Sequence, residues 1–194
     1  MASDEDSEAL YEQSRRGKCA DVQALLERGV APDSFMAYDG STALAIASRS
    51  GHADVVCLLL AHRAAMDTRT DDGSSLLMHA VSGGSCAAVE ALLAAGAEAN
   101  EENDDGVTPL ILAADKGLAQ VAKVLLAARA DVTTQAEDWG SALETALDAG
   151  HAEVAEVLRA AGGATGGAAK DGGERKIAAS EQWGYDAFDG EEDY

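Results

Sequence analysis

The segment DGVTPLILAADKG, residues 105–117, combines a turn, a helix start and a helix stop. Asp105-Gly106 is a turn signal, and Thr108 is a residue that commonly caps a helix N-terminus. Pro109 follows at the first helical position, where its missing N–H costs nothing. The apolar run then ends at Gly117, a residue type that interrupts helices. The segment therefore predicts a short helix that begins after Thr108 and ends before Gly117.

The same pattern recurs along the chain with a period of 33 residues. Four sets of equivalent residues show it: Asp39, Asp72, Asp105 and Asp138; Thr42, Ser75, Thr108 and Ser141; Leu44, Leu77, Leu110 and Leu143; and Gly51, Gly84, Gly117 and Gly150. Upstream, a spacing of 34 aligns Gly17 with Gly51, and the extra residue falls in the loop at 35–38. A sustained period of this length indicates a stacked repeat architecture. The predicted units are 7–38, 39–71, 72–104, 105–137 and 138–163.

Each unit contains two predicted helices joined by turns. In the second unit the first helix covers about 43–50, and the second helix lies around 55–61, where apolar residues recur at helical spacing. Neither helix could bury its apolar face alone, but stacked units would share one continuous core. The chain contains 42 alanines, and small side chains of this kind let neighbouring helices approach closely.

The period, the GVTPLILAA segment at 106–114 and the Gly-His pairs at 51–52 and 150–151 resemble ankyrin repeats. The resemblance covers about residues 7–163 and implies an all-α solenoid of helix-turn-helix units with protruding hairpin loops. Two departures stand out: Ile111 occupies the histidine position of the family's Thr-Pro-Leu-His motif, and arginines 63 and 129 stand where Gly96 stands in its unit. A left-handed backbone at those arginines would cost about 1 kcal/mol each, so their units are expected to be looser or to turn differently.

Both ends of the chain differ from the repeats. Residues 1–6 are predicted to form an acidic N-terminal tail, and the Gly-rich residues 164–180 have the composition of a flexible linker. Residues 181–194 are acidic and contain four aromatic side chains: Trp183, Tyr185, Phe188 and Tyr194. Two interpretations of this last segment stay open, a solvated terminus or a motif that folds on binding a basic and apolar groove.

Composition excludes several classes of function. The chain has 194 residues with 35 acidic and 14 basic side chains, a formal net charge of −21, which disfavours nucleic acid and anionic membrane surfaces. It has no membrane-spanning run and no basic, apolar leader at its N-terminus, so we expect a cytoplasmic or else a nuclear protein. Three cysteines suggest no disulfide framework. We expect the protein to be a monomer on its own.

Motifs for catalysis, cofactors and metals are not evident in the sequence, and we expect neither enzymatic activity nor a bound cofactor or metal. Glu101, Asn103, Asp105 and Gly106 match the first positions of a calcium loop, but Leu112 stands where the bidentate glutamate should be. The four histidines show no ligand spacing.

The resemblance implies that partners bind at the loops between units and at the exposed edge of the first helices. Mapped onto this chain, the candidate partner-binding residues are Phe35, Tyr38, Arg49, Arg69, Asp71, Asp72, Asp104, Asp105, Val107, Lys116, Glu137 and Trp139. Large aromatic side chains at such positions make good interface anchors. The alternative is that Phe35 and Trp139 pack locally and shield the first and last units.

The net charge is concentrated in the later units, because residues 67–162 carry −12 and residues 13–66 carry +1. This asymmetry favours a non-enzymatic adaptor or scaffold whose acidic loops bind a basic protein partner. A solvated face that only keeps the chain soluble is the simpler explanation. An inhibitory or regulatory subunit of an enzyme and an acidic chaperone for a basic client are the alternative functions.

Overall fold

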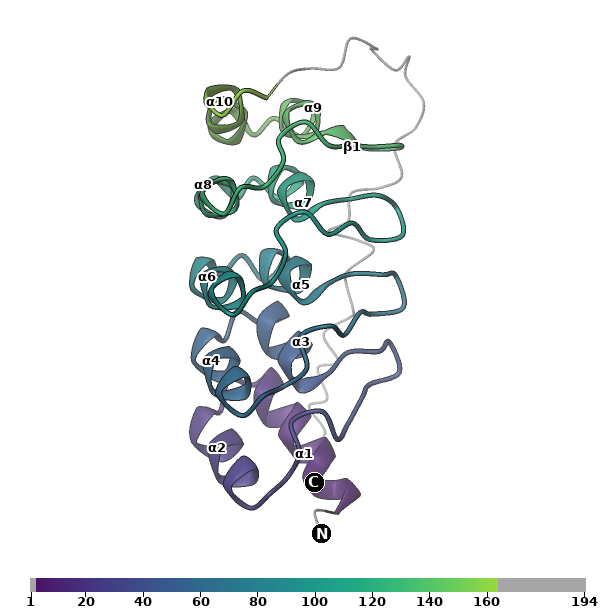
Figure 1. Cartoon of the computed structure of the whole chain (residues 1–194), viewed down its shortest axis with the longest axis vertical. Helices are drawn as coiled ribbons and strands as arrows, with labels where there is room; N and C mark the ends of the chain where they lie inside the picture. The colour runs from purple at the N-terminus through teal and green to yellow at the C-terminus, as the bar shows by residue number, and fades with distance from the viewer. Residues whose placement is uncertain (1–2, 164–194) are drawn as a thin grey trace, which may run out of the picture.

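The computed structural model describes residues 3–163, which form five helix pairs stacked along one axis (Figure 1). The first helices of the pairs are α1 (Asp4–Arg15), α3 (Ala43–Arg49), α5 (Leu76–Ser82), α7 (Pro109–Asp115) and α9 (Ala142–Asp148). The second helices are α2 (Cys19–Glu27), α4 (Ala53–Ala61), α6 (Cys86–Ala94), α8 (Ala119–Ala127) and α10 (Ala152–Ala160). Two short strands, β1 (Gln135–Ala136) and β2 (Gly140–Ser141), pair antiparallel between α8 and α9. The predicted all-α solenoid is confirmed.

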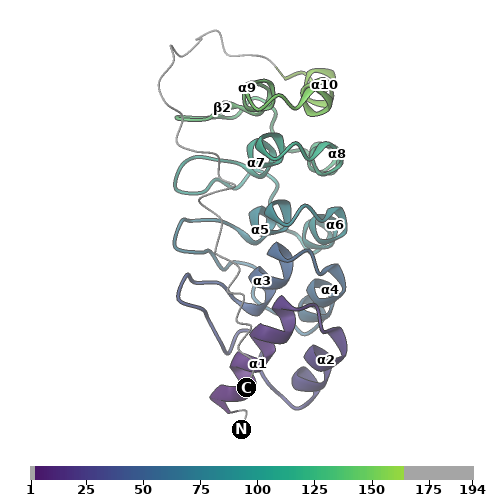
Figure 2. The same cartoon turned by 180° about the vertical axis from the view of Figure 1, so that it is seen from behind.

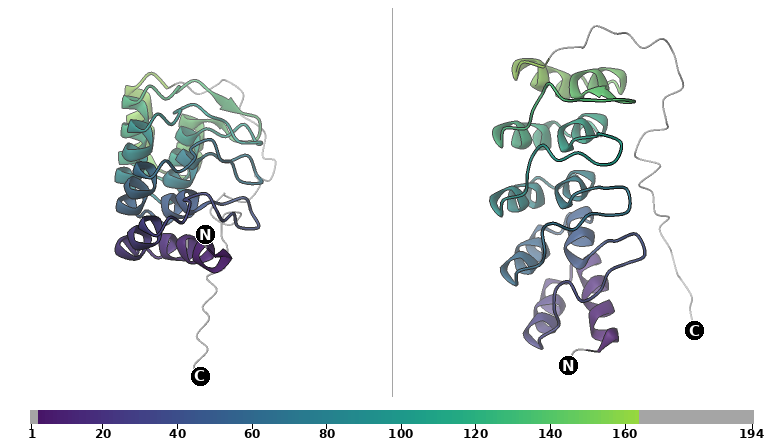
Figure 3. Two further views of the ribbon diagram at one scale, coloured as in Figure 1. Left: turned by 60° about the horizontal axis from the view of Figure 1, so that its bottom comes forward. Right: turned by 45° about the vertical axis from the view of Figure 1, so that its right-hand side comes forward.

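The helices form two layers, and a loop projects from the side of the first layer before each new pair (Figures 1 and 2). We call these loops finger 1 (between α2 and α3), finger 2 (between α4 and α5), finger 3 (between α6 and α7) and finger 4 (between α8 and α9). Each first helix packs against the first helix of the next pair, as α3 does against α5. Figure 3 shows the fingers extending away from both layers, so they offer the molecule's protruding surface.

Repeated leucines and alanines form the core that joins the pairs. Leu59, Leu92, Leu125 and Leu158, which occupy one repeat position, are all 0% exposed. Full burial of a leucine side chain stabilises a fold by about 2 kcal/mol. Alanines at another repeat position, such as Ala80 and Ala113, are equally buried and allow the close helix stacking. The core is therefore continuous along the stack.

Helix capping follows the predicted pattern at three of four positions. The hydroxyls of Thr42, Thr108 and Ser141 each accept a hydrogen bond at 3.3 Å from a backbone N–H in the first turn of α3, α7 and α9. Ser75 is the N-cap of α5, but its side chain makes no capping hydrogen bond. The first helices end within a residue or two of the predicted bounds, whereas α4 begins at Ala53, two residues before the predicted start.

The predicted boundary of an acidic tail at residues 1–6 is wrong, because α1 begins at Asp4. Ser3 caps this helix, and it forms a reciprocal capping box with Asp6. Acidic residues in a first turn interact favourably with the positive end of the helix dipole. The Asp6 carboxylate also lies 2.8 Å from the guanidinium of Arg28. These acids belong to the first helix pair.

The turns after α4 and α8 keep the left-handed backbone of their glycine counterparts. Arg63 and Arg129 have φ values of 61° and 65°, in the same region as Gly96 at 101°. The alternative that these units use another turn is therefore wrong. Packing of the flanking helices holds the turn in place against a local cost of about 1 kcal/mol.

Candidate partner-binding groove

A groove of about 330 Å³ runs along the fingers beside the first helices. Its lining consists of Tyr38, Asp39, Arg49, Thr70, Asp71, Asp72, Met78, His79, Asn103, Asp105, Val107, Leu112 and Trp139. The structure thus brings together seven of the residues that the sequence predicted to bind a partner: Tyr38, Arg49, Asp71, Asp72, Asp105, Val107 and Trp139. We call this cavity the finger groove.

The floor of the finger groove is apolar and buried. Met78, Val107 and Leu112 are 1%, 4% and 2% exposed. Val107, which the sequence predicted to contact a partner, lies in this floor with its side chain almost fully buried. Its N–H donates to the side-chain oxygen of Asn103 at 2.9 Å, which ties the residue to the base of finger 3 and turns its side chain toward the core.

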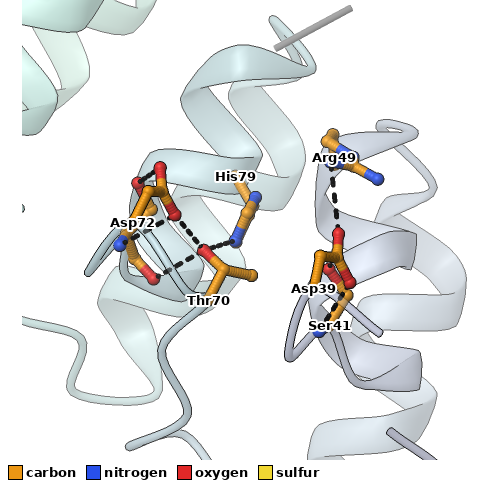
Figure 4. Close-up of polar contacts among 7 residues, drawn as sticks. Asp39, Ser41, Arg49, Thr70, Asp72 and His79 are labelled. Carbon is orange, nitrogen blue, oxygen red and sulfur yellow. Dashed lines mark hydrogen bonds and ion pairs between the residues drawn. The ribbon is translucent and has the colours of Figure 1, made fainter. Parts of the chain in front are cut away.

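Two aspartates on the wall are fixed by hydrogen bonds within their own fingers (Figure 4). Asp39 accepts from the N–H of Ser41 at 2.9 Å and from its hydroxyl at 2.8 Å. Asp72 accepts from the hydroxyl of Ser74 at 2.8 Å and from that of Thr70 at 2.6 Å. Burial alone would raise the pKa of Asp72, but these hydrogen bonds outweigh it and lower the pKa overall. The Asp72 side chain is therefore a fixed, ionised carboxylate.

In finger 3 an asparagine replaces the aspartate in this local role. The side-chain oxygen of Asn103 accepts from the N–H of Asp105 at 3.1 Å, and the Asp105 side chain itself lies exposed at the groove. Backbone hydrogen bonds join successive fingers: Asp71 N–H donates to the carbonyl of Asp39 at 3.1 Å, and Asp104 N–H to that of Asp72 at 3.3 Å. Fingers 1, 2 and 3 therefore form one continuous wall.

The two arginines of this face have different surroundings. Arg69 pairs with Glu101 at 3.1 Å and donates to the carbonyls of Gly73 at 2.8 Å and Glu102 at 3.2 Å. It joins fingers 2 and 3 and is absent from the groove lining. Arg49 lines the groove, and its guanidinium lies 4.0 Å from the carboxylate of Asp39 (Figure 4). Among the lining residues described, four are carboxylates and one is a guanidinium.

His79 lies behind this wall on α5 and is 2% exposed. Its Nε2 is 3.2 Å from the hydroxyl oxygen of Thr70, whose proton points to the Asp72 carboxylate, an acceptor only. Nε2 therefore carries the proton and donates to Thr70. Burial lowers the pKa of His79 from 6.5 to about 4, and the positive charge of Arg49 acts in the same direction; Asp72 and Asp39 oppose it.

We expect acid to destabilise the fold through His79. The unfolded chain takes up a proton near pH 6.5 and the folded chain only near pH 4, so the free energy of unfolding falls as pH falls across that window. The loss between about pH 7.5 and pH 5 should be about 2 kcal/mol. Urea unfolding at both pH values measures it.

The matched variant for this prediction is His79→Leu, since Ile46 and Leu112 occupy the same repeat position in the neighbouring units and are buried. This variant should lose most of the difference in stability between the two pH values. An unchanged pH difference in His79→Leu would assign the acid sensitivity to other groups.

The aromatic residues of the fingers divide into three cases. Tyr38 is 99% exposed at the groove mouth. Trp139 is half-buried against the core but still lines the groove, and its carbonyl accepts from the hydroxyl of Thr145 at 3.0 Å. Phe35 is not an exposed anchor, because its ring packs against that of Tyr11 of α1 in a tilted arrangement, with centroids 5.2 Å apart. The interpretation that Phe35 packs locally is confirmed.

The remaining predicted residues lie away from the groove lining. Asp104 and Glu137 are exposed on fingers 3 and 4, and Lys116 is half-buried at the C-cap of α7. The linker at 164–180 and the segment 181–194, with Trp183, Tyr185, Phe188 and Tyr194, lie outside the described residues.

Sequence reasoning missed six of the lining residues: Asp39, Thr70, Met78, His79, Asn103 and Leu112. Asp39 had a usable signal, since it shares the repeat position of Asp72 and Asp105. Met78 and Leu112 look like ordinary core residues in the sequence. Thr70 lies on a finger and His79 on a helix, and no local sequence pattern predicts their contact.

Within residues 3–163 no group of His, Cys, Asp and Glu side chains is arranged to hold a metal ion. The helices of this part of the chain include none long and apolar enough to cross a membrane.

Comparison with known families identifies the repeats. The family described as "Ankyrin repeats (3 copies)" matches residues 77–166, and "Ankyrin repeat" matches residues 39–71. The matches begin after the first helix pair, in which the longer α1 follows no finger. No curated protein matched the chain significantly. Ankyrin repeats generally mediate protein–protein interactions and are typically non-enzymatic, and this chain belongs to the ankyrin repeat family.

Proposed function

We propose that the protein is a non-enzymatic adaptor that binds a basic segment of a partner protein in the finger groove. The observation that carries this proposal is the composition of the groove: the carboxylates of Asp39, Asp71, Asp72 and Asp105 stand above an apolar floor. A Lys or Arg side chain suits such a site, because its alkyl stem can cover apolar surface while its charged head pairs with a carboxylate.

Binding at this groove needs little rearrangement of the protein. Hydrogen bonds already fix Asp72, and the backbone bonds between fingers hold the wall together. Preorganised sites lose less conformational entropy when they bind. The surplus of negative charge over residues 67–162 would also steer a basic partner, so affinity should fall as salt rises.

The test compares two charge-reversal pairs in the full chain. We expect Asp71→Lys with Asp105→Lys to weaken binding of a fluorescent Arg-rich peptide at least about tenfold, because the groove then repels a base. The control is Glu90→Lys with Glu156→Lys, which changes the net charge equally on exposed positions of α6 and α10. Fluorescence anisotropy at low and high salt measures the affinities.

The control pair should weaken binding far less than the groove pair. Equal losses in the two pairs would show that the peptide responds to net charge alone, and the groove would then not be the binding site. A peptide of the same length with glutamates in place of arginines should not bind.

A further inference from the structure

The acidic residues of the groove stand at a regular spacing. Asp72 and Asp105 occupy one repeat position, so they are separated by one step of the stack. Packed helices lie about 8–10 Å apart. The hydrogen bond from Asp104 N–H to the Asp72 carbonyl keeps fingers 2 and 3 from splaying, so their separation follows the same step. The backbone positions that carry these two carboxylates are therefore about 8–10 Å apart along one wall.

The step of about 8–10 Å matches the spacing of same-face residues in one extended conformation better than in the others. In polyproline II, residues three apart lie on the same face and are about 9.3 Å apart. In a β-strand, same-face residues are about 6.7 Å or 13 Å apart, and both distances miss the step. We infer that the groove binds its partner as a polyproline II segment with two basic residues three positions apart, which face Asp72 and Asp105. This inference rests on the proposed function.

The ends of the groove limit the basic pattern to two positions. At finger 1, the guanidinium of Arg49 already lies 4.0 Å from Asp39, so a third base of the partner would meet a cation there. At finger 4, the groove lining includes Trp139 and omits Asp138, the residue equivalent to Asp105. The third position in that direction therefore faces an aromatic ring and suits proline or leucine. The recognised chemistry is basic-x-x-basic-x-x-apolar.

The test uses synthetic peptides that share one composition and differ in spacing. Each carries two arginines and one leucine in a Pro/Ala background, with the arginines two, three, four or seven positions apart. We expect the three-residue spacing to bind the full chain at least about fivefold more tightly than the others by fluorescence anisotropy. With glycine in place of proline, the same peptide should bind more weakly, since it is no longer preorganised.

Neutralising one aspartate of the groove tests whether the preferred arginine spacing depends on the fingers. In the Asp105→Asn variant, the affinity for the peptide whose arginines are three positions apart should fall to that of a peptide with one arginine. Glu102→Gln, an exposed side chain of the same finger outside the groove lining, should leave the preference intact. A third arginine three positions toward either end should improve affinity by less than about twofold, since neither end of the groove presents an unopposed carboxylate in register.

The outcomes separate this inference from the proposed function. Equal binding at all four spacings, still lost in the groove charge-reversal pair, would overturn the polyproline II register and leave the basic partner in place. A preference for an arginine spacing of two or four residues would also overturn the polyproline II register, in favour of a strand or of one face of a helix. A preference for a spacing of seven residues would indicate two turns of a helix. If no basic peptide binds, the proposed function fails and the register with it.

Discussion

Replacing Gly83 by alanine is expected to lower the free energy of unfolding by about 3 kcal/mol, the upper range of overpacking effects. Gly83 is the C-cap of α5, with an ordinary φ of −73°. A Cβ there would overlap the carbonyl oxygen of Arg49 and lie 2.8 Å from that of Ser48. Both atoms belong to the backbone at the end of α3. Neither can rotate away, so α3 and α5 would have to separate.

The repeat itself supplies the control for this prediction. Lys116 and Ala149 occupy the same C-cap position in α7 and α9, so a side chain there is compatible with the unit. Lys116→Ala should change the free energy of unfolding by less than about 1 kcal/mol, as surface substitutions usually do. Urea denaturation followed by circular dichroism measures both variants. A loss below about 1 kcal/mol for Gly83→Ala would mean that the close approach of α3 to α5 relaxes without much cost.

Gly83 also shows where prediction of the fold from sequence ends. The period drew attention to Gly84 and its equivalents, because features that recur in every unit are visible as a pattern. The helix bounds and the buried leucines followed from the same repetition. Gly83 has no glycine equivalent in its neighbours, so only the packing of α3 against α5 explains it. A contact between two particular units carries no periodic signal.

The groove was predictable to the extent that it is periodic. Asp72, Asp105, Tyr38 and Trp139 were predicted because the repeat places them on the fingers, whereas Asp39 was missed although it shares the repeat position of Asp72. The burial of Val107 depends on which way the base of finger 3 turns, and the repeat pattern does not show this. The contact between His79 and Thr70 depends on side chains of a finger and a helix meeting, a geometry that sequence spacing does not encode.

Replacing Gly117 by alanine should cost about 3 kcal/mol for two separable reasons. Gly117 has a φ of +70°, which costs a residue with a Cβ about 1–2 kcal/mol. Its Cβ would also lie 2.6 Å from Nδ1 of His151. That ring is held in place because its Nε2 hydrogen-bonds the carbonyl oxygen of Asp115 at 2.9 Å. Overpacking against a fixed ring adds about 1–3 kcal/mol.

Gly150 separates these two causes, because it has a φ of +76° and a Cβ added there would meet no atom within 4 Å. Gly150→Ala should therefore cost only the backbone part, about 1–2 kcal/mol. Removing the ring tests the other part: in a His151→Ala background, Gly117→Ala should cost no more than Gly150→Ala. If the penalty at Gly117 persists without the ring, the clash with His151 is not its source. Because His52 meets Gly17 in the same way, with Nε2 3.0 Å from the carbonyl oxygen of Arg15, the same cycle should hold at the other end of the stack.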